Sequence, residues 1–360
     1  MKKYIPRLAC LSFIITAISA FIYFLSRESV RIADFLNSTV SVALRFILSC
    51  ISYPFPFSVF EILIILSPVI LVLTVVILVR RASDRAVMIR SISSVFAVIA
   101  LILTSYIFTL GIGYHTTPLA ERIDVEDDPN LTADELYYTI SCVVEELNSH
   151  AEKLSLNEKE TVMPYSVDEM SRRLVKAYDR MNFEYSILTN YTSRVKPVYF
   201  STVMSDLGIS GIYSFFTGES NVNVEYPDYC LPFTAAHELA HQRGICRENE
   251  ANFVAFLVCI SSDDDYIRYS GYLNMYEYLA SALYRTDRDL YREVANKVSP
   301  IAIADIRAAN EVYVKHKDSP LGKMNERLND AYLKANGTEG VVSYGYVVRL
   351  AVGYYGKNEK

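Results

Sequence analysis

The sequence predicts N-terminal transmembrane α-helices, three in number, followed by a mostly α, α+β domain. Residues 1–113 are mostly apolar, whereas residues 114–360 have the composition of a soluble domain. In the second part, segments with a helical apolar period flank one short stretch rich in β-forming residues. We therefore expect a membrane domain over residues 1–113 and a separate domain over residues 114–360.

Three stretches of the first part are long enough to cross a bilayer, which takes about 20 apolar residues per helix. They are residues 8–25, 62–79 and 92–113. No small-x-small cleavage site follows the first stretch, so we expect an uncleaved anchor. Residues 35–57, "FLNSTVSVALRFILSCISYPFPF", are interrupted by Arg45 and end in two prolines. We interpret them as an interfacial amphipathic helix and a turn.

The distribution of Lys and Arg predicts the orientation, because short cytoplasmic loops are enriched in positive charge. These residues cluster at the N-terminus and between the second and third stretches: Lys2, Lys3, Arg7, Arg80, Arg81, Arg85 and Arg90. Three crossings then place everything after Gly113 outside the cytoplasm. We expect a multi-pass protein of the cell membrane, with the lipid bilayer as a partner and an extracytoplasmic C-terminal domain.

Charge and cysteine usage exclude some classes of protein. The net charge is -6 and no basic stripe with interleaved aromatic residues is present, so nucleic acid is not an expected partner. The six cysteines do not form the pattern of a disulfide framework. Cys230 and Cys246 flank the motif described below, and the sequence leaves open whether they pair in an oxidising compartment.

The second part begins with helices and continues through a β-rich stretch. Thr132, with a Glu three residues later, predicts a capping box at the start of a helix. A second helix is expected from Ser166 to about Met181. Residues 196–230 favour short strands and loops, with "NVNVEY" at 221–226 as the best strand candidate. Helical periodicity then continues almost to the end of the chain.

The stretch "TAAHELAHQRG" at 234–244 contains the pattern HExxH. On a helix, His237 and His241 project from one face, so both imidazoles reach a single metal at about 2.0–2.1 Å. Glu238 lies about 100° around the helix, which suits a base acting on metal-activated water better than a ligand. We expect Zn²⁺ as the cofactor, His237 and His241 as ligands, and Glu238 as the general base.

The alternative to a metal site is a solvated helix face that happens to carry two histidines. That alternative predicts charged residues between the histidines. The flanking positions instead hold the small or apolar residues Ala235, Ala236, Leu239 and Ala240. The flanks therefore favour a buried helix with functional polar side chains.

A catalytic zinc needs a third protein ligand and one open position. The candidates are Glu248, Glu250 and, less favoured, Cys246. Gly244 is expected to stop the first helix, so that the chain can turn and start a second helix near Arg247.

Helical periodicity favours Glu248 over Glu250 as the third ligand. Glu248 and Asn252 share a face with Ala251 and Ala255, and these small residues would let the second helix approach the first closely. Asn252 could then hydrogen-bond a ligand or orient a histidine. Glu250 remains the alternative metal ligand.

HELAH followed by E-x-E-A-N resembles the gluzincin pattern of CAAX-prenyl-peptidase-type and ImmA/IrrE-type metallopeptidases, in which a Glu in an E-x-x-x-[DN] helix completes HExxH. This resemblance implies a zincin-like domain with His237, His241 and Glu248 as ligands, Glu238 as the base and Asn252 as the orienting residue. The separation between the two parts of the pattern is shorter here than in most such enzymes.

The whole chain, from the second apolar stretch nearly to the C-terminus, resembles a family of bacterial membrane proteins known as DUF3810. The resemblance is carried by "PFSVFE", "GIYSFFTGESNVN", "FTAAHELAHQRGICRENEANFVAFL", "RYSGY" and "DAYLKANGTEGVVSYGYVV". It implies a gluzincin-like zinc metallopeptidase-type domain.

Two functions from different classes follow. The leading hypothesis is a membrane-anchored zinc-dependent peptidase that hydrolyses peptide bonds of a peptide or protein substrate outside the cytoplasm, with Glu238 as the general base. The alternative is a non-catalytic membrane-tethered binding or scaffold protein that retains a zinc-peptidase fold. Retention of Glu238 favours the peptidase, because a purely structural site needs no base.

Weaker features concern substrate binding. "FTGESNVN" at 216–223 could supply an edge strand to which an extended substrate adds, or a structural turn and strand. Arg268, Tyr269 and Tyr272 are candidate donors to a transition-state oxyanion. His316, in the charged run "KHKD", is expected to be solvated.

Overall fold

The structure is a computed structural model that describes residues 5–80, 84–154, 159–336 and 344–358. Lys2, Lys3 and Arg81, on which the predicted orientation partly rests, lie outside the described residues. The chain forms two compact units, Met1–Thr116 with Ser214–Glu219, and Thr117–Tyr213 with Ser220–Lys360. We call them the membrane unit and the outer unit. The sequence predicted a single boundary at residue 113. In the structure, residues 214–219, which come after that boundary, belong to the first unit.

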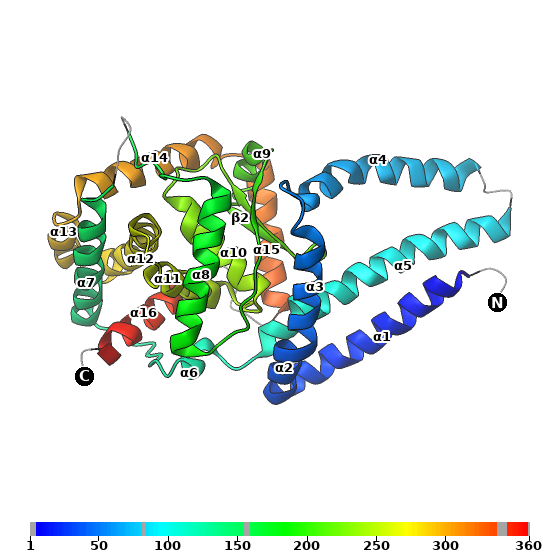
Figure 1. The fold of residues 1–360 in the computed structure, drawn as a ribbon, viewed down its shortest axis with the longest axis horizontal. Helices are drawn as coiled ribbons and strands as arrows, with labels where there is room; N and C mark the ends of the chain where they lie inside the picture. Colours follow the sequence, from blue (N-terminus) through cyan, green and yellow to red (C-terminus); the bar gives the residue numbers. More distant parts are fainter. Residues whose placement is uncertain (1–4, 81–83, 155–158, 337–343, 359–360) are drawn as a thin grey trace. The chain divides into compact units, whose positions relative to one another are not determined.

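The membrane unit is built from helices (Figure 1). In chain order they are α1 (Arg7–Glu28), α2 (Val30–Leu36), the π-helical turn η1 (Asn37–Ser41), α3 (Val42–Ser52), α4 (Val59–Arg80), α5 (Arg85–Thr109) and the 3₁₀ turn η2 (Gly111–His115).

By length and composition, four of the described helical stretches could cross a membrane, one more than the three expected. The additional stretch is Val30–Ser52, in which α2, η1 and α3 are continuous. The prediction treated Arg45 as an interruption. In the structure Arg45 is 1% exposed and donates hydrogen bonds to the side chain and backbone carbonyl of Asn37 and to the carbonyl of Thr109. Its charge is therefore satisfied inside the unit, and the helix continues through it.

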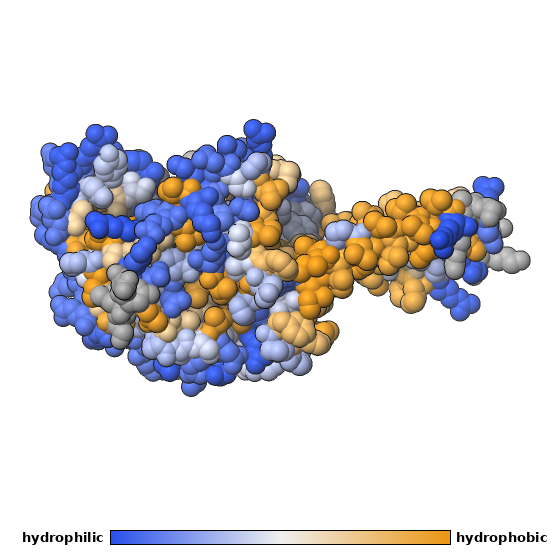
Figure 2. All heavy atoms as spheres, turned by 90° about the horizontal axis from the view of Figure 1, so that it is seen from above, coloured by the Kyte–Doolittle hydropathy of each residue, from blue (hydrophilic) through white to orange (hydrophobic). Residues whose placement is uncertain are grey.

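The membrane unit turns its apolar side chains outward. Helix α4 buries no residue, and the surface of these helices is hydrophobic (Figure 2). Helices α1 and α5 pack through small residues instead: the hydroxyl of Thr16 lies 2.9 Å from the carbonyl of Ala100 and 2.9 Å from the hydroxyl of Thr104. Small and hydroxylated residues at a helix contact with apolar residues outside are typical of membrane bundles. Figure 1 shows α3 running across the direction of α1 and α5.

Residues 214–219 are held by the membrane helices. The carboxylate of Glu219 accepts hydrogen bonds from the backbone N–H groups of Val59 and Phe60 at 3.0 and 2.7 Å. It thereby caps the N-terminus of α4 and complements the helix dipole. The hydroxyl of Ser105 on α5 donates to the carbonyl of Phe215 at 2.6 Å.

The outer unit is mostly helical with one small sheet. Its elements are α6 (Leu119–Arg122), α7 (Ala133–Ala151), α8 (Val167–Tyr185), β1 (Val195–Val198), α9 (Ser201–Asp206), β2 (Gly211–Ser214), β3 (Glu219–Asn223), α10 (Cys230–Gln242), α11 (Glu248–Ile260), α12 (Asp265–Thr286), α13 (Arg288–Ala295), α14 (Pro300–His316), α15 (Pro320–Ala335) and α16 (Tyr344–Asn358).

The three strands lie in the order β1-β3-β2. Strands β1 and β3 are parallel, with Val195 opposite Ser220 and Val198 opposite Asn223. Four residues join β2 to β3, too few for a parallel crossover, so these two strands form a hairpin. The sequence left open whether residues 216–223 supply an edge strand or a structural turn and strand. The second alternative is confirmed and the first is wrong, because β3 pairs on both sides and the two edges of the sheet are β1 and β2.

Local signals in the sequence correctly placed several helix ends. The predicted capping box is confirmed, since Thr132 and Glu135 bond to each other's backbone N–H groups at the start of α7. Ser166 caps α8, which runs to Tyr185, four residues beyond the expected end at Met181. Helix α9 was not expected, and β3 begins two residues before the predicted strand at 221–226.

Helices α10, α11 and α12 pack together at the centre of the outer unit. Most of α11 is inaccessible to solvent, with Phe253, Val254 and Phe256 each 0% exposed. Helix α12 packs on α11, and α7 packs on α12. All six cysteines lie within the described residues and none forms a disulfide, so Cys230 and Cys246 are not joined to each other.

Candidate metal centre

Helix α10 presents the two histidines of the motif on one face. The ring centroids of His237 and His241 lie 4.6 Å apart, and their side chains are 13% and 9% exposed. The residues around them, including Ala236, Leu239 and Ala240, are 0% exposed. The helix is therefore buried on its apolar sides, as the flanking residues predicted.

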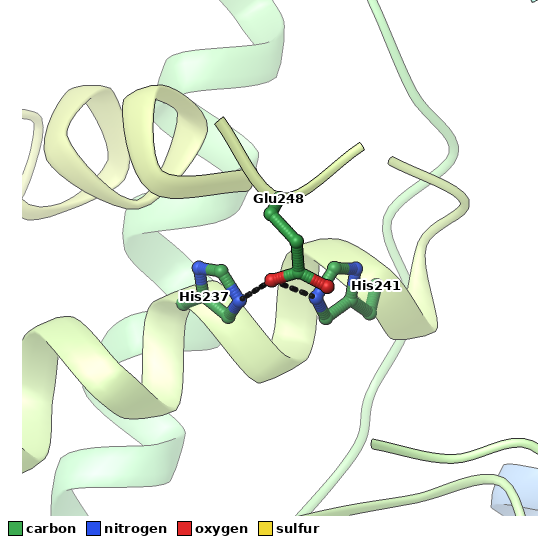
Figure 3. A group of neighbouring side chains, drawn as sticks. All are labelled: His237, His241 and Glu248. Carbon is green, nitrogen blue, oxygen red and sulfur yellow. Dashed lines mark ion pairs between the residues drawn. The ribbon is translucent and has the colours of Figure 1, made fainter. Parts of the chain in front are cut away.

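The turn after α10 brings a carboxylate back to the histidines. Gly244 has φ +97°, a left-handed conformation that favours glycine and ends the helix as predicted. Helix α11 begins at Glu248, whose Oε2 lies 3.2 Å from Nε2 of His237 and 3.6 Å from Nε2 of His241 (Figure 3). Ala251 and Ala255 are 0% exposed, and α10 packs against α11.

The distances from Glu248 to the two histidines match the spacing of zinc ligands. Ligand atoms that each lie about 2.0–2.1 Å from a tetrahedral zinc are roughly 3.3–3.4 Å apart. The Glu248–histidine separations of 3.2 and 3.6 Å bracket this value, and among the described residues these three side chains form a group whose ligand atoms all lie within 4.8 Å of one another. His237, His241 and Glu248 thus fit a zinc ion. They leave a fourth position without a protein ligand in the described part of the chain.

The two histidines differ in what their other ring nitrogen contacts. Nδ1 of His241 lies 2.8 Å from the carbonyl of Ile245, which assigns the proton to Nδ1 and leaves Nε2 available for a metal. Nδ1 of His237 is buried and has no hydrogen-bond partner among the described residues. Asn252, expected to orient a ligand, makes no hydrogen bond to either histidine or to Glu248.

Glu250, the alternative ligand, lies elsewhere. Its side chain is 3% exposed, and Oε1 accepts hydrogen bonds from the backbone N–H of Leu119 at 3.0 Å and from Arg247 at 2.8 Å. On α11, Glu248 and Glu250 are about 200° apart. Glu250 therefore caps the start of α6, while Glu248 faces the histidines.

Glu248 and His241 set each other's pKa in the metal-free chain. Burial alone would lower the pKa of His241, but the carboxylate of Glu248 raises it to about 9. Burial would raise the pKa of Glu248, yet His241 and His237 hold it well below its ordinary value. Because a proton on this group would compete with a cation, binding of a metal there would release the proton.

Glu238 lies beside His237 and His241 and against strand β2. It is 5% exposed, and burial raises its pKa, although His237, His241 and the backbone N–H of Tyr213 act in the opposite direction. A carboxylate with a raised pKa is a stronger base, which suits general base catalysis.

Side chains from distant elements hold α10 in place. Ser220 on β3 donates to the carbonyl of Glu238 at 3.0 Å, and Tyr178 on α8 donates to the carbonyl of Ala236 at 2.6 Å. Arg243, 3% exposed, donates to the carbonyl of Leu239 at the end of the helix. Sequence reasoning missed all three. Arg243 had a usable signal, a basic residue at a helix C-terminus, whereas the other two contacts have none.

The candidate oxyanion donors are engaged elsewhere. Tyr269 donates to Asp305 at 2.6 Å, and Arg268 donates to the carbonyl of Ser262. The ring of Tyr272 stacks on that of His150, with centroids 5.8 Å apart. None of the three is brought to His237, His241 and Glu248.

Comparison with known proteins identifies the family. The family described as protein of unknown function (DUF3810) matches residues 34–352. The chain belongs to the DUF3810 family. No curated protein and no solved structure matches the chain. The family match covers most of the membrane unit and nearly all of the outer unit, including His237, His241 and Glu248.

Proposed function

We propose that this DUF3810 protein is a membrane-anchored, zinc-dependent peptidase with a zincin-like catalytic domain. The observation that carries the proposal is the convergence of Nε2 of His237, Nε2 of His241 and Oε2 of Glu248, with the buried carboxylate of Glu238 beside them. A purely structural zinc would not need this carboxylate and would close its fourth position with another protein ligand.

Each residue has a distinct role in the proposed reaction. The two histidines and Glu248 would hold zinc, which when bound is a Lewis acid that acidifies water and polarises a carbonyl. Glu238 takes the proton from the attacking water and returns it to the leaving amine. Atoms balance, because the water supplies the hydroxyl of the new carboxyl group and the proton of the new amine.

The position of β2 supports a peptide as the substrate class. This strand forms one edge of the sheet, and its first residue, Gly211, lies against the side chain of Glu238. An extended peptide that adds to a strand edge gains backbone hydrogen bonds and is presented in a fixed direction. The edge strand and the base therefore suit cleavage within an extended segment.

We place the catalytic domain outside the cytoplasm. The Lys/Arg distribution and three crossings, by α1, α4 and α5, support this orientation. The course of α3 across α1 and α5 in Figure 1 supports counting three crossings instead of four. Four crossings would put the domain on the side of the N-terminus, and protease protection of the domain in right-side-out vesicles distinguishes the two.

The test of the function compares three forms of the full chain purified in detergent. The wild type is expected to hold about one zinc per chain and to cleave members of a peptide library. Glu238→Gln is expected to keep the zinc and lose cleavage. Glu145→Gln is the matched control, because Glu145 is an exposed residue of α7. A wild type that purifies without zinc and takes up none contradicts the proposal. A zinc-loaded wild type that leaves the library uncut while capturing a partner supports a scaffold instead.

A further inference from the structure

Gly211, the first residue of β2, lies against the side chain of Glu238. A Cβ atom at Gly211 would lie 2.6 Å from Oε1 and 2.8 Å from Cγ of Glu238. Carbon atoms in contact are normally about 3.5–4.0 Å apart. A side chain at this position therefore fits only if Glu238 moves.

Space, and not backbone conformation, is the reason for glycine here. Among the described residues, the glycines with positive φ are Gly208, Gly218 and Gly244, and Gly211 is not one of them. Its backbone can be adopted by any residue, so alanine at this position introduces the methyl group without backbone strain. The effect of such a substitution would report on the contact with Glu238.

The sheet holds Glu238 at one further point. The hydroxyl of Ser220 on β3 donates a hydrogen bond to the backbone carbonyl of Glu238 at 3.0 Å. At Gly211, the carboxylate lies directly against the backbone of the edge strand.

We propose that Gly211 is a positioning residue for the reaction: its missing side chain lets the carboxylate of Glu238 lie against β2, beside His237 and His241. This inference rests on the proposed function, in which Glu238 is the base. Because Glu238 is not a metal ligand, displacement of its carboxylate should leave zinc binding intact and impair the proton transfer alone.

One neighbouring contact has to be separated from this effect. The same Cβ would lie 2.7 Å from Cγ2 of Thr234, one turn before Glu238 on α10. Thr234→Ser removes that methyl group and retains the hydroxyl. We therefore use the Thr234→Ser variant as the parent, so that of the three atoms nearest to a Cβ at residue 211 only the two of Glu238 remain.

The activity test adds Gly211→Ala to this parent in the full-length protein. Zinc content is expected to stay at about one per chain and KM to change less than about twofold. The value of kcat is expected to fall about 100-fold, because a misplacement of about 1 Å can cost that much. Gly356→Ala is the control, since no atom lies within 4 Å of a Cβ built there. A parent that cleaves peptides and is unaffected in kcat by Gly211→Ala overturns the inference while leaving the proposed function standing.

A second measurement is independent of cleavage, so it decides the inference even if no peptide is cut. Thermal unfolding is followed for a double-mutant cycle of Gly211→Ala and Glu238→Ala in the Thr234→Ser parent. Gly211→Ala is expected to lower Tm by several degrees with Glu238 present and by clearly less in the Glu238→Ala background. Equal Tm changes in both backgrounds would show that residue 211 does not act on Glu238, and would overturn the inference.

Discussion

Two clusters of histidine and carboxylate side chains in the outer unit can be compared directly. The metal cluster, named for the proposed function, is His237, His241 and Glu248. The ring-bridging cluster is Asp206, His316 and Glu225, in which Nδ1 of His316 lies 2.7 Å from Asp206 and Nε2 lies 3.1 Å from Glu225. Both contain imidazole and carboxylate, yet only the first has its ligand atoms converging on one point.

The difference lies in which ring nitrogens meet the carboxylates. In the metal cluster, each imidazole directs Nε2 to the same oxygen of Glu248. In the ring-bridging cluster, the carboxylates bind opposite nitrogens of one ring, so no single ion can reach all three residues. His316 therefore ties the end of α14 to α9 and to the chain after β3. The arrangement of lone pairs, and not the residue types, distinguishes a metal site from a structural ion pair.

The largest expected difference between the clusters is in zinc content. His237→Ala or His241→Ala removes a ligand, so purified protein should hold less than roughly a tenth of the wild-type zinc. His316→Ala should leave the content at about one zinc per chain. Metal analysis of the three variants after gel filtration checks this. Loss of zinc from the His316 variant would mean that the second cluster is part of the metal site.

The two carboxylates of α11 offer a comparison within one helix. Glu248→Gln should weaken zinc binding by more than about 100-fold, since substitution of residues outside the ligand shell alone costs 10–100-fold. Glu250→Ala should leave zinc affinity unchanged and lower the free energy of unfolding by about 2–4 kcal/mol, because the Leu119 N–H and Arg247 lose their acceptor.

Zinc titration by competition with a chelator, together with urea unfolding, separates the two effects. If the Glu250 variant lost zinc affinity and the Glu248 variant kept it, Glu250 and not Glu248 would be the ligand.

A smaller effect on stability is expected at His316. The sequence predicted a solvated side chain, which is wrong, because the side chain is 7% exposed. His316→Gln keeps hydrogen-bonding capacity but loses the charge between two carboxylates, and should lower the free energy of unfolding by about 1 kcal/mol. Zinc content serves as the control readout and should not change.

The smallest expected effect is the pH dependence of the stabilisation that His316 provides. Burial would raise the pKa of Glu225, but hydrogen bonds from Lys315, Ser205 and His316 lower it to about 2. The contribution of ionised Glu225 to the free energy of unfolding is complete above about pH 4.5 and is lost as the pH falls toward 2. The bond with Asp206 and that with Glu225 raise the pKa of His316, so its contribution is complete below 6.5 and is lost as the pH rises through the raised pKa.

The stability difference between wild type and His316→Gln should therefore be largest between about pH 4.5 and 6.5 and shrink on both sides. Urea unfolding across this range measures it. A difference that stays constant from pH 4 to 9 would show that the charge of His316 makes no contribution.

The sequence by itself determined what depends on neighbours along the chain. The spacing of His237 and His241 places both on one helix face, and Gly244 ends that helix because it is free to adopt a left-handed conformation. The capping box at Thr132 follows from two side chains three residues apart. Each of these features is a property of one or two turns of backbone, so a local pattern is enough to predict it.

Only the tertiary structure decided which faces meet. Glu248 faces the histidines and Glu250 faces α6 because of the rotation of α11 about its own axis where it packs on α10. The two side chains point about 200° apart around α11, so a different rotation would exchange them. Strand β2, which contacts Glu238, comes from a distant part of the chain. So does Thr109, whose carbonyl accepts a hydrogen bond from buried Arg45. The periodicity of a helix or strand predicts which side chains share a face. Which other element packs against that face depends on contacts between segments far apart in the sequence.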